Sequence, residues 1–341
     1  MAAGEIAELA KGPSAAGRSF QHGDTSGLRI RLICQMLMEN PKRLPGGPVT
    51  GRSGRFAPPA PKPPTEEDAL RVLRALPPFS AVAVHLLKLV TQEGVPFRTL
   101  ADALRTDAPL SAATLRIANS ALFGPRLPVT GVLHAIAMLG LDRVRSMVTT
   151  AALKNFAYSG RGTTALVRCW RHNLACALIC EEISRKTKLE RDFAYTAGLL
   201  HDIGRLAMMR AWLPRYAALL DSANPDAYAL LDLEIREFGI RHTRAGSVLL
   251  KEWKLPDVFA EIANHHHDPR APDQADVAAL VAFACSLADA VGFGVTAPPP
   301  VKGAASECIQ HSAFTEIAAG TLDDLGARLA ERINELECCL V

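Results

Sequence analysis

Apolar residues recur at helical spacing along most of the chain beyond about residue 66. In "VTGVLHAIAMLGLDRVRSMVTTAALKNF" one apolar helix face contains Val132, Ile136 and Leu139 and the next contains Leu141, Val144 and Met147, and Gly140 separates the two runs. A half-buried strand would instead show strict alternation of apolar and polar residues, which is absent from this sequence over any useful length. The pattern therefore predicts an all-α protein.

The same periodicity predicts longer helices in the second half of the chain. Expected helices cover 163–187 and 191–212, two more join at Phe238–Gly239, a short one ends at Pro269, and an apolar one runs to the glycines at 292–294. A final amphipathic helix is expected from about Leu322 to Leu340. It could dock on its own chain or pair with a second copy, and docking is the more common outcome for a helix of this length.

Composition divides the chain and limits its function. Residues 1–65 are rich in Gly, Pro, Ser and Arg, which predicts a disordered or linker-like N-terminal segment, and residues 301–341 are expected to form a C-terminal linker and the last helix. The net charge of +3 includes no Lys/Arg block and only 6% of residues are aromatic, so nucleic acid is not an expected partner. No stretch reaches the length of a membrane span, which predicts a cytoplasmic protein without a membrane association.

The cysteines are expected to have no chemical role. Three of them, Cys169, Cys176 and Cys180, lie in one apolar helical pattern, and Cys285 lies in another. None forms a CxxC pair of the kind found in zinc knuckles and redox motifs. We therefore interpret them as reduced, buried thiols that pack as small apolar residues.

Polar residues inside apolar helices are the candidate chemistry of the chain. The stretch "GLLHDIGRLAMM" contains adjacent His201 and Asp202, and burying such groups without partners would cost several kcal/mol. Similar settings surround His172 in "WRHNLACAL" and Asp289 in "SLADAVG". A lone buried histidine is most often a hydrogen-bonded core residue, but several together, aimed inward from separate helices, suit a divalent metal.

The pattern allows one or two metal ions of the class Fe, Mn, Ni, Zn or Mg. The first ion would take His172, His201, Asp202 and Asp289, and the second would take His242, His265 and His266, with Asp202 as a bridge. Two such ions would hold a hydroxide suited to attack on a phosphoester. The neighbouring His267 is expected to face water, because it adjoins the helix end and Asp268.

The order of His172, then His201–Asp202, then Asp289 resembles the HD superfamily of metal-dependent phosphohydrolases, and the additional histidines resemble its HD-GYP branch. A longer part of the chain resembles the HDOD family. "LPPFSAVAVHLLKLV", "TDAPLSAATLRIANSALFG" and "LHAIAMLGLDRVRSMV" are similar to its N-terminal helical lobe, and "AYTAGLLHDIGRLAM" with "EFGIRHTRAGSVLLKEWKLPDVFAEIANHHHDP" to its HD-like lobe. The resemblance implies an HDOD domain over residues 66–300, divided into lobes at 66–160 and 161–300.

This resemblance implies a bacterial signal-transduction output module. Most HDOD domains have lost part of the ligand set and are regarded as non-catalytic, whereas a full set of candidate ligands is legible here. The chain also departs from active HD-GYP enzymes, because "HHHDPRAPDQ" stands where a GYP element would follow and Arg205 stands in place of the lysine after "HDIG". Arginine stays protonated and has a different shape, so it is not a simple replacement for that lysine.

Two functions remain open from the sequence. We favour a regulatory module that binds a signalling protein partner or a nucleotide ligand and retains a metal site. The alternative is a metal-dependent phosphohydrolase that acts on a nucleotide or cyclic dinucleotide, with Asp202 bridging two ions and Arg205 steadying the phosphate. In the motif "RIANSALFG" we expect Arg116, Asn119 and Ser120 to cap and tie helix ends rather than contact a ligand. The sequence does not specify the input signal, the substrate or the oligomeric state.

Overall fold

The structure is a computed structural model. It describes residues 64–77, 81–90, 96–120, 125, 128–158, 162–222, 227–271, 273–297, 309, 312–319 and 324–339. The predicted N-terminal linker and most of the predicted linker after residue 300 lie outside the described residues.

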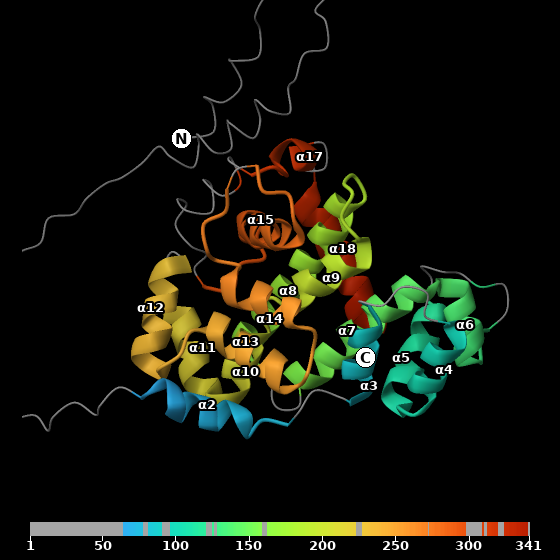
Figure 1. The fold of residues 1–341 in the computed structure, drawn as a ribbon, viewed down its shortest axis with the longest axis horizontal. Coiled ribbons are helices and arrows are strands. Elements are labelled where there is room, and N and C mark those ends of the chain that lie inside the picture. The colour runs from blue at the N-terminus through green and yellow to red at the C-terminus, as the bar shows by residue number, and fades with distance from the viewer. Residues whose placement is uncertain are drawn as a thin grey trace, which may run out of the picture.

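The protein is built from helices, which confirms the predicted fold class, and no strand occurs in the described part of the chain (Figure 1). The first helices in chain order are α2 (Glu66–Arg74), α3 (Ala81–Val90), α4 (Phe97–Arg105), α5 (Ala108–Ala118), α6 (Val132–Leu139) and α7 (Leu141–Ala157). Helices α4, α5 and α6 pack on one another at one end of the molecule, and α7 connects them to the rest (Figure 1). The proposed boundary between two lobes near residue 160 remains a prediction.

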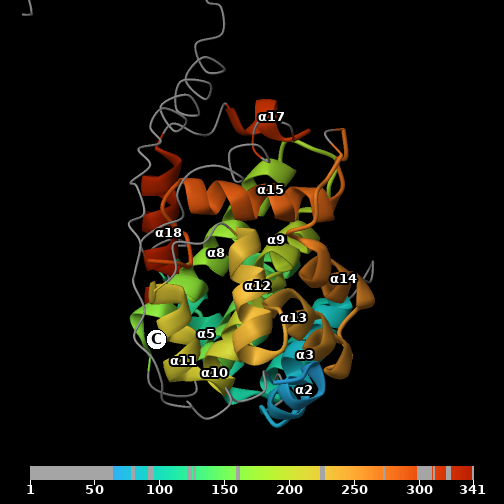
Figure 2. The ribbon, with the colours of Figure 1, turned by 90° about the vertical axis from the view of Figure 1, so that its left-hand side faces the viewer.

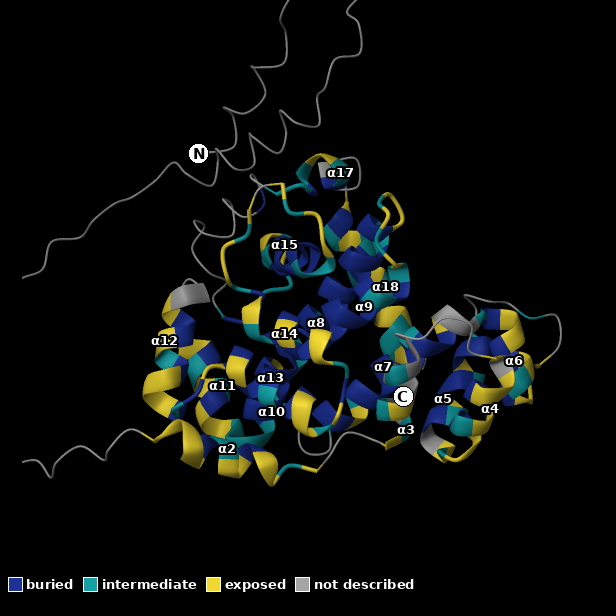
Figure 3. Ribbon diagram, viewed as in Figure 1, coloured by how far each residue is buried: buried dark blue, intermediate teal, exposed yellow. Residues whose placement is uncertain are grey.

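The second half of the chain surrounds a long buried helix, α8. Most residues of α8 are buried, and α9 and α15 pack directly against it (Figures 2 and 3). The helices of this half are α8 (Thr164–Ser184), α9 (Arg191–Leu200), α10 (Ile203–Ala211), α11 (Leu213–Ser222), α12 (Ala227–Phe238), α13 (His242–Glu252), α14 (Asp257–His265), α15 (Val277–Ala290), α17 (Thr315–Ala319) and α18 (Leu325–Cys339). No helix in the described ranges combines the length and the apolarity needed to cross a membrane.

Local sequence signals account for several helix boundaries. Gly140 separates α6 from α7 with a positive φ of 84°, and Gly239 ends α12 with a φ of 77°, both in a region that favours glycine. Asp107 caps α5 by accepting a hydrogen bond from the backbone N–H of Leu110. Pro109 therefore lies inside the first turn of α5, where a missing N–H costs little, rather than between α4 and α5.

The prediction of one continuous helix over 191–212 is wrong, because the helix is interrupted at His201 and Asp202. Helix α9 ends at Leu200 and α10 begins at Ile203, while Asp202 has φ −106° and ψ 23°. Two glycines let the separate helices approach different neighbours. A methyl group at Gly198 would press on the backbone of α8, and one at Gly204 would overlap the carbonyl oxygen of His242. The interruption therefore places His201 and Asp202 between α8 and α13.

The C-terminal helix α18 docks on its own chain, as expected. Leu325, Leu329 and Ile333 are buried on the face that meets α8. Arg171 on α8 donates to Glu337 on α18 at 2.6 Å. This contact gives the helix a polar as well as an apolar anchor.

Candidate metal centre

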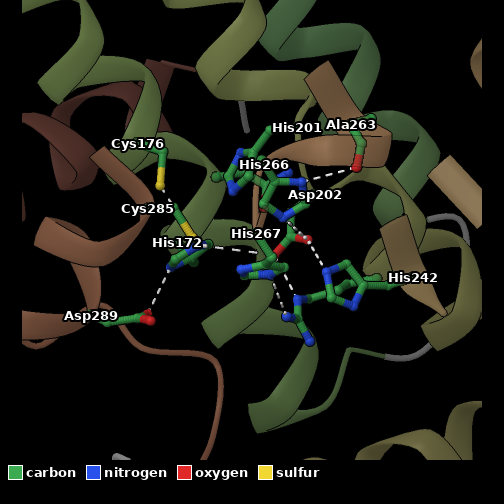
Figure 4. Close-up of polar contacts among 12 residues, drawn as sticks. His172, Cys176, His201, Asp202, His242, Ala263, His266, His267, Cys285 and Asp289 are labelled. Atoms are coloured by element: carbon green, nitrogen blue, oxygen red, sulfur yellow. Dashed lines mark hydrogen bonds and ion pairs between the residues drawn. The ribbon is translucent and has the colours of Figure 1, made fainter. Parts of the chain in front are cut away.

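Five polar residues predicted as metal ligands converge inside the second half of the molecule (Figure 4). They come from the body of α8, the junction of α9 and α10, the start of α13 and the end of α14. None is more than 2% exposed. These residues are His172, His201, Asp202, His242 and His266.

Two of these histidines are fixed by the same local device. His201 follows the last residue of α9, and its Nδ1 lies 2.7 Å from the carbonyl oxygen of Gly198. His266 follows the last residue of α14, and its Nδ1 lies 2.9 Å from the carbonyl oxygen of Ala263. A carbonyl oxygen only accepts hydrogen bonds, so each Nδ1 must carry the proton and donate. With Nδ1 bound to backbone, each ring turns its Nε2 toward the cluster, and burial lowers the pKa of His201.

His242 is oriented by a carboxylate instead of a carbonyl. Its Nδ1 lies 2.7 Å from Glu234, which also accepts from the backbone N–H of His242 at 2.8 Å and from the Tyr216 hydroxyl at 2.6 Å. Burial would raise the pKa of Glu234, but the bonds from His242 and the nearby Arg205 hold that pKa below its ordinary value. An ionised Glu234 therefore holds the His242 ring with Nε2 pointing to the cluster.

Asp202 lies at the centre of the cluster, and its two oxygens have different neighbours. Oδ1 lies 3.2 Å from His242 Nε2 and 3.5 Å from His266 Nε2. Oδ2 accepts from Arg205 Nε at 2.6 Å. Burial favours the neutral acid, but Arg205 and His242 hold the pKa of Asp202 well below its ordinary value. Arg205 also reaches Glu234 at 3.3 Å, so one guanidinium is shared by two buried carboxylates.

Sulfur lines the other side of the cluster. His172 Nε2 lies 3.6 Å from Cys176 Sγ and 3.5 Å from Cys285 Sγ, while its Nδ1 donates to the carbonyl oxygen of Phe293 at 2.8 Å. A hydrogen bond from the Cys176 thiol and the facing His172 ring lower the pKa of Cys285 well below its ordinary value. Burial would lower the pKa of His172, but the charge on Cys285 raises it to about 10.

The expected inward direction of His265 is wrong. Its side chain is 52% exposed, its Nδ1 lies 2.6 Å from Asp268, and its Nε2 contacts Asn264. His267, which we expected to face water, instead packs against His266 with ring centroids 4.1 Å apart at a tilt of 44°, and its ring centroid lies 5.2 Å from that of His242. Helix α14 ends at His265, and the chain turns after it. Because of this turn, His267 and not His265 faces the cluster.

Asp289 also departs from the prediction. Its Oδ1 lies 3.4 Å from Nδ1 of His172, on the edge of the ring that faces away from Cys176 and Cys285 (Figure 4). Its side chain is 22% exposed, and burial raises the pKa of Asp289 to about 7. Asp289 therefore contacts the Nδ1 edge of the His172 ring and does not join Asp202 at the centre of the cluster.

Sequence comparison identifies the fold to which this arrangement belongs. The profile of the HDOD domain matches residues 76–269, which is more than half of the chain. The chain belongs to the HDOD family. It is also 21% identical over 216 residues to an uncharacterised protein of Treponema pallidum (strain Nichols), covering 61% of this chain and 41% of that relative. The chain thus spans less than half the length of this curated relative.

Solved structures show the same fold. An HDOD domain protein of unknown function from Geobacter sulfurreducens is 24% identical, with a TM-score of 0.62, and the match covers 80% of this chain and 97% of the other. A Shewanella amazonensis SB2B protein, provisionally named a phosphohydrolase, is also 24% identical, with a TM-score of 0.58 and coverage of 80% and 98%. At these identities the likeness establishes an HDOD fold, and the chemistry must be argued from the residues.

The residues present in this HDOD chain fit a transition metal. His201 Nε2, His242 Nε2, His266 Nε2 and Asp202 Oδ1 are buried without a hydrogen bond of ordinary geometry. Buried polar atoms in native proteins nearly always have a partner, so the convergence of these acceptors calls for a cation. Imidazole nitrogen and sulfur favour Zn²⁺, Fe²⁺ or Ni²⁺. Mg²⁺, also among the predicted ions, fits least, because it prefers oxygen ligands in an octahedron.

Sequence reasoning missed Cys176 and Cys285. Groups of residues whose donor atoms could hold an ion include Cys176 with His172 and His201, and Cys285 with His201 and His266. A signal was present in the spacing, because Cys176 lies four residues after His172 and Cys285 four residues before Asp289. Residues four apart share a helix face, so each thiol had to lie on the same face as a predicted ligand.

Proposed function

We propose that this chain is a regulatory output module of the HDOD type. Its buried centre holds a divalent ion, and the domain recognises a signalling protein partner or a nucleotide without hydrolysing it. The observation that carries this proposal is the 2.6 Å hydrogen bond from Arg205 to Oδ2 of Asp202. Arginine is always protonated, so this oxygen is held by a permanent cation.

The Arg205 contact weighs against hydrolysis. A two-ion phosphohydrolase needs a carboxylate that offers one oxygen to each ion. Oδ1 of Asp202 faces His242 and His266, whereas Oδ2, which lies 3.9 Å from His172 Nε2, already accepts the hydrogen bond from Arg205. Arg205 itself is 3% exposed and engaged with both Asp202 and Glu234, so it is not presented to a phosphate arriving from solvent. A bound divalent ion would supply a fixed positive charge that joins α8, α10, α13 and α14.

Burial points in the same direction. Cys176, Cys285 and the five convergent polar residues are each at most 5% exposed. A phosphodiester would have to reach donor atoms that side chains already enclose, whereas a small ion needs far less access. An ion in this position would act by fixing the relative placement of the helices, which is how a metal controls a recognition surface on the outside of a fold.

The test is to measure binding and turnover on the same preparation. Protein purified without a His-tag would be loaded in turn with Zn²⁺, Fe²⁺, Mn²⁺ and Ni²⁺. It would then be incubated with bis(p-nitrophenyl) phosphate and with a panel of linear and cyclic dinucleotides. We expect no product above the rate of a metal-free sample.

A thermal-shift assay on the same nucleotide panel asks whether the domain binds without reacting. Stabilisation by one nucleotide class without product supports a nucleotide ligand, and its absence with every class assigns recognition to a protein partner. Product that forms with metal and disappears in Asp202→Ala, with the fold intact by circular dichroism, would instead establish the phosphohydrolase.

A further inference from the structure

We propose that the sulfur side of the cluster is a thiolate–imidazole site for Zn²⁺ formed by His172, Cys176, His201 and Cys285. The inference rests on the metal binding proposed above and specifies which side chains hold the ion. It replaces the predicted ligand Asp289 with Cys285, one turn earlier on the same helix.

The four donor residues fall into two overlapping groups that share His201. The ligand atoms of His172, Cys176 and His201 all lie within 4.8 Å of one another. Cys285 completes the set. Its Sγ lies 3.5 Å from His172 Nε2, and its ligand atom forms with those of His201 and His266 a second group within the same limit.

The distances at His172 match tetrahedral zinc. With Zn–S bonds of about 2.3 Å and Zn–N bonds of about 2.0 Å, tetrahedral angles place a ligand nitrogen and a ligand sulfur about 3.6 Å apart. The observed separations from His172 Nε2 are 3.6 Å to Cys176 and 3.5 Å to Cys285. Each sulfur therefore already lies at the distance from His172 Nε2 that a shared zinc ion would impose.

The rings are held as metal-binding histidines are held elsewhere. His172 Nδ1 lies 2.8 Å from the carbonyl oxygen of Phe293, and His201 Nδ1 lies 2.7 Å from that of Gly198. A ligating histidine usually donates its other ring N–H to a carbonyl or carboxylate, which fixes the ring and leaves the free nitrogen for the ion. His172 and Cys176 lie one turn apart on α8, so folding of that helix alone presents half of the site.

Charge distinguishes the sulfur side, with Cys176 and Cys285, from the carboxylate side, by which we mean the part of the cluster around Asp202 and Glu234. Asp202 and Glu234 already share the positive charge of Arg205, which leaves the carboxylate side with one net negative charge. Two thiolates balance a divalent ion completely, and soft sulfur ligands select zinc over the harder ions that carboxylates prefer. We therefore place the ion between the sulfurs rather than between Asp202 and His242.

X-ray absorption spectroscopy of the zinc-loaded, wild-type protein tests the site without a mutation. The protein would be purified without a His-tag under reducing conditions, loaded with Zn²⁺ and freed of excess metal. We expect two sulfur ligands per zinc at about 2.3 Å and two nitrogen ligands at about 2.0 Å. A first shell of nitrogen and oxygen alone would overturn the proposal. It would also be overturned if the protein failed to retain zinc, or if a Cys176–Cys285 disulfide persisted under the reducing conditions.

Cobalt substitution adds a test that assigns the sulfurs to residues. Co²⁺ bound by thiolates gives a sulfur-to-metal charge-transfer band in the near ultraviolet. We expect this band in the wild type, and we expect Cys176→Ser and Cys285→Ser each to lose at least half of its intensity. Cys180→Ser is the matched control, because Cys180 is equally buried on α8 but belongs to none of the donor groups. An unchanged band in either test variant would overturn the assignment.

The outcomes separate this inference from the proposed function. Zinc in a nitrogen and oxygen shell that is lost in Asp202→Asn would move the ion to the carboxylate side, refuting the thiolate site while leaving the regulatory module intact. Turnover of a phosphodiester by protein with a confirmed sulfur shell would refute the non-hydrolytic function and leave the thiolate site standing. Circular dichroism of each variant shows whether a lost band reflects a lost ligand or a lost fold.

Discussion

Helices α4–α7 and the helices around the cluster both fix polar side chains with hydrogen bonds, but Asn119 does so while exposed, whereas the cluster is buried. Asn119, at the end of α5, donates to the carbonyl oxygens of Leu115 and Val129 and accepts from the N–H of Val129, each within 2.8 Å. Every polar atom of that side chain is engaged with backbone. At His201 and His266 one ring nitrogen bonds to backbone and the other remains a free acceptor inside the fold.

The difference separates polar groups that stabilise a fold from polar groups that are held ready for a ligand. A satisfied amide contributes to stability and leaves nothing to bind. A cluster of buried acceptors and carboxylates costs stability unless a cation offsets it. In this protein Arg205 offsets part of the charge, and the sulfur side remains for a metal.

The largest expected effect comes from removing the internal cation. Arg205→Met would leave Asp202 and Glu234 buried without their shared partner, and breaking a buried ion pair in this way costs about 3–5 kcal/mol. Urea unfolding of metal-free protein measures the loss. Arg210→Met, on the same helix but with a half-buried guanidinium bonded to the Phe156 carbonyl, is the control and should cost clearly less. Equal losses for the two variants would contradict the role of the buried pair.

A smaller effect is expected in the N-terminal helices. Asn119→Ala removes the three side-chain hydrogen bonds to Leu115 and Val129, but the side chain is exposed and water can replace part of them, so the change should cost about 0.5–1.5 kcal/mol. Because Asn119 lies outside the cluster, zinc stoichiometry and affinity should not change. Calorimetric titration of folded Asn119→Ala with Zn²⁺ checks this, and an altered affinity would mean that the two halves of the molecule are coupled.

The buried carboxylates of the cluster should also make the stability of the protein sensitive to acid. Asp202 and Glu234 have pKa values held below their ordinary values of 3.8 and 4.5, so the unfolded chain binds protons that the folded protein excludes. Their contribution to stability is therefore present above about pH 4.5 and is lost as pH falls below that range. Glu234→Gln binds no such proton on unfolding, so its stability should fall less steeply, by up to about 1.4 kcal/mol per pH unit. Urea midpoints between pH 3 and 7 would show it, and parallel slopes for wild type and variant would count against an ionised Glu234.

The sequence was sufficient for the fold because helical periodicity is a local property. The sequence was also sufficient to predict the five candidate ligands that converge, since a histidine or aspartate inside an apolar helix can be recognised from its neighbours in the sequence. The break between α9 and α10 was not predictable in this way. It depends on Gly198 meeting α8 and Gly204 meeting α13, contacts between segments that are distant in the chain.

The remaining errors in the site have the same origin. Asp289 was placed correctly on an inward helix, but which edge of the His172 ring it would meet depends on the position of α15 across α8. The cysteines were read by their usual preference for burial, and burial is what they show, with 0% exposure at Cys176 and 5% at Cys285. Their second property, contact with His172, appears only once α8 and α15 are packed together.

The smallest expected effect distinguishes the three consecutive histidines at the end of α14. His265→Ala removes an exposed side chain whose partner is Asp268, so stability should change by about 0.5 kcal/mol or less and zinc affinity should not change. His267→Ala is the matched variant, because it removes a neighbouring imidazole that packs against His242 and His266 and would disturb both rings. Parallel zinc titrations and urea melts of the two variants compare them directly. If His265→Ala destabilised the protein more than His267→Ala, the inward direction of His267 would be refuted, and the original expectation that His265 serves the cluster would be restored.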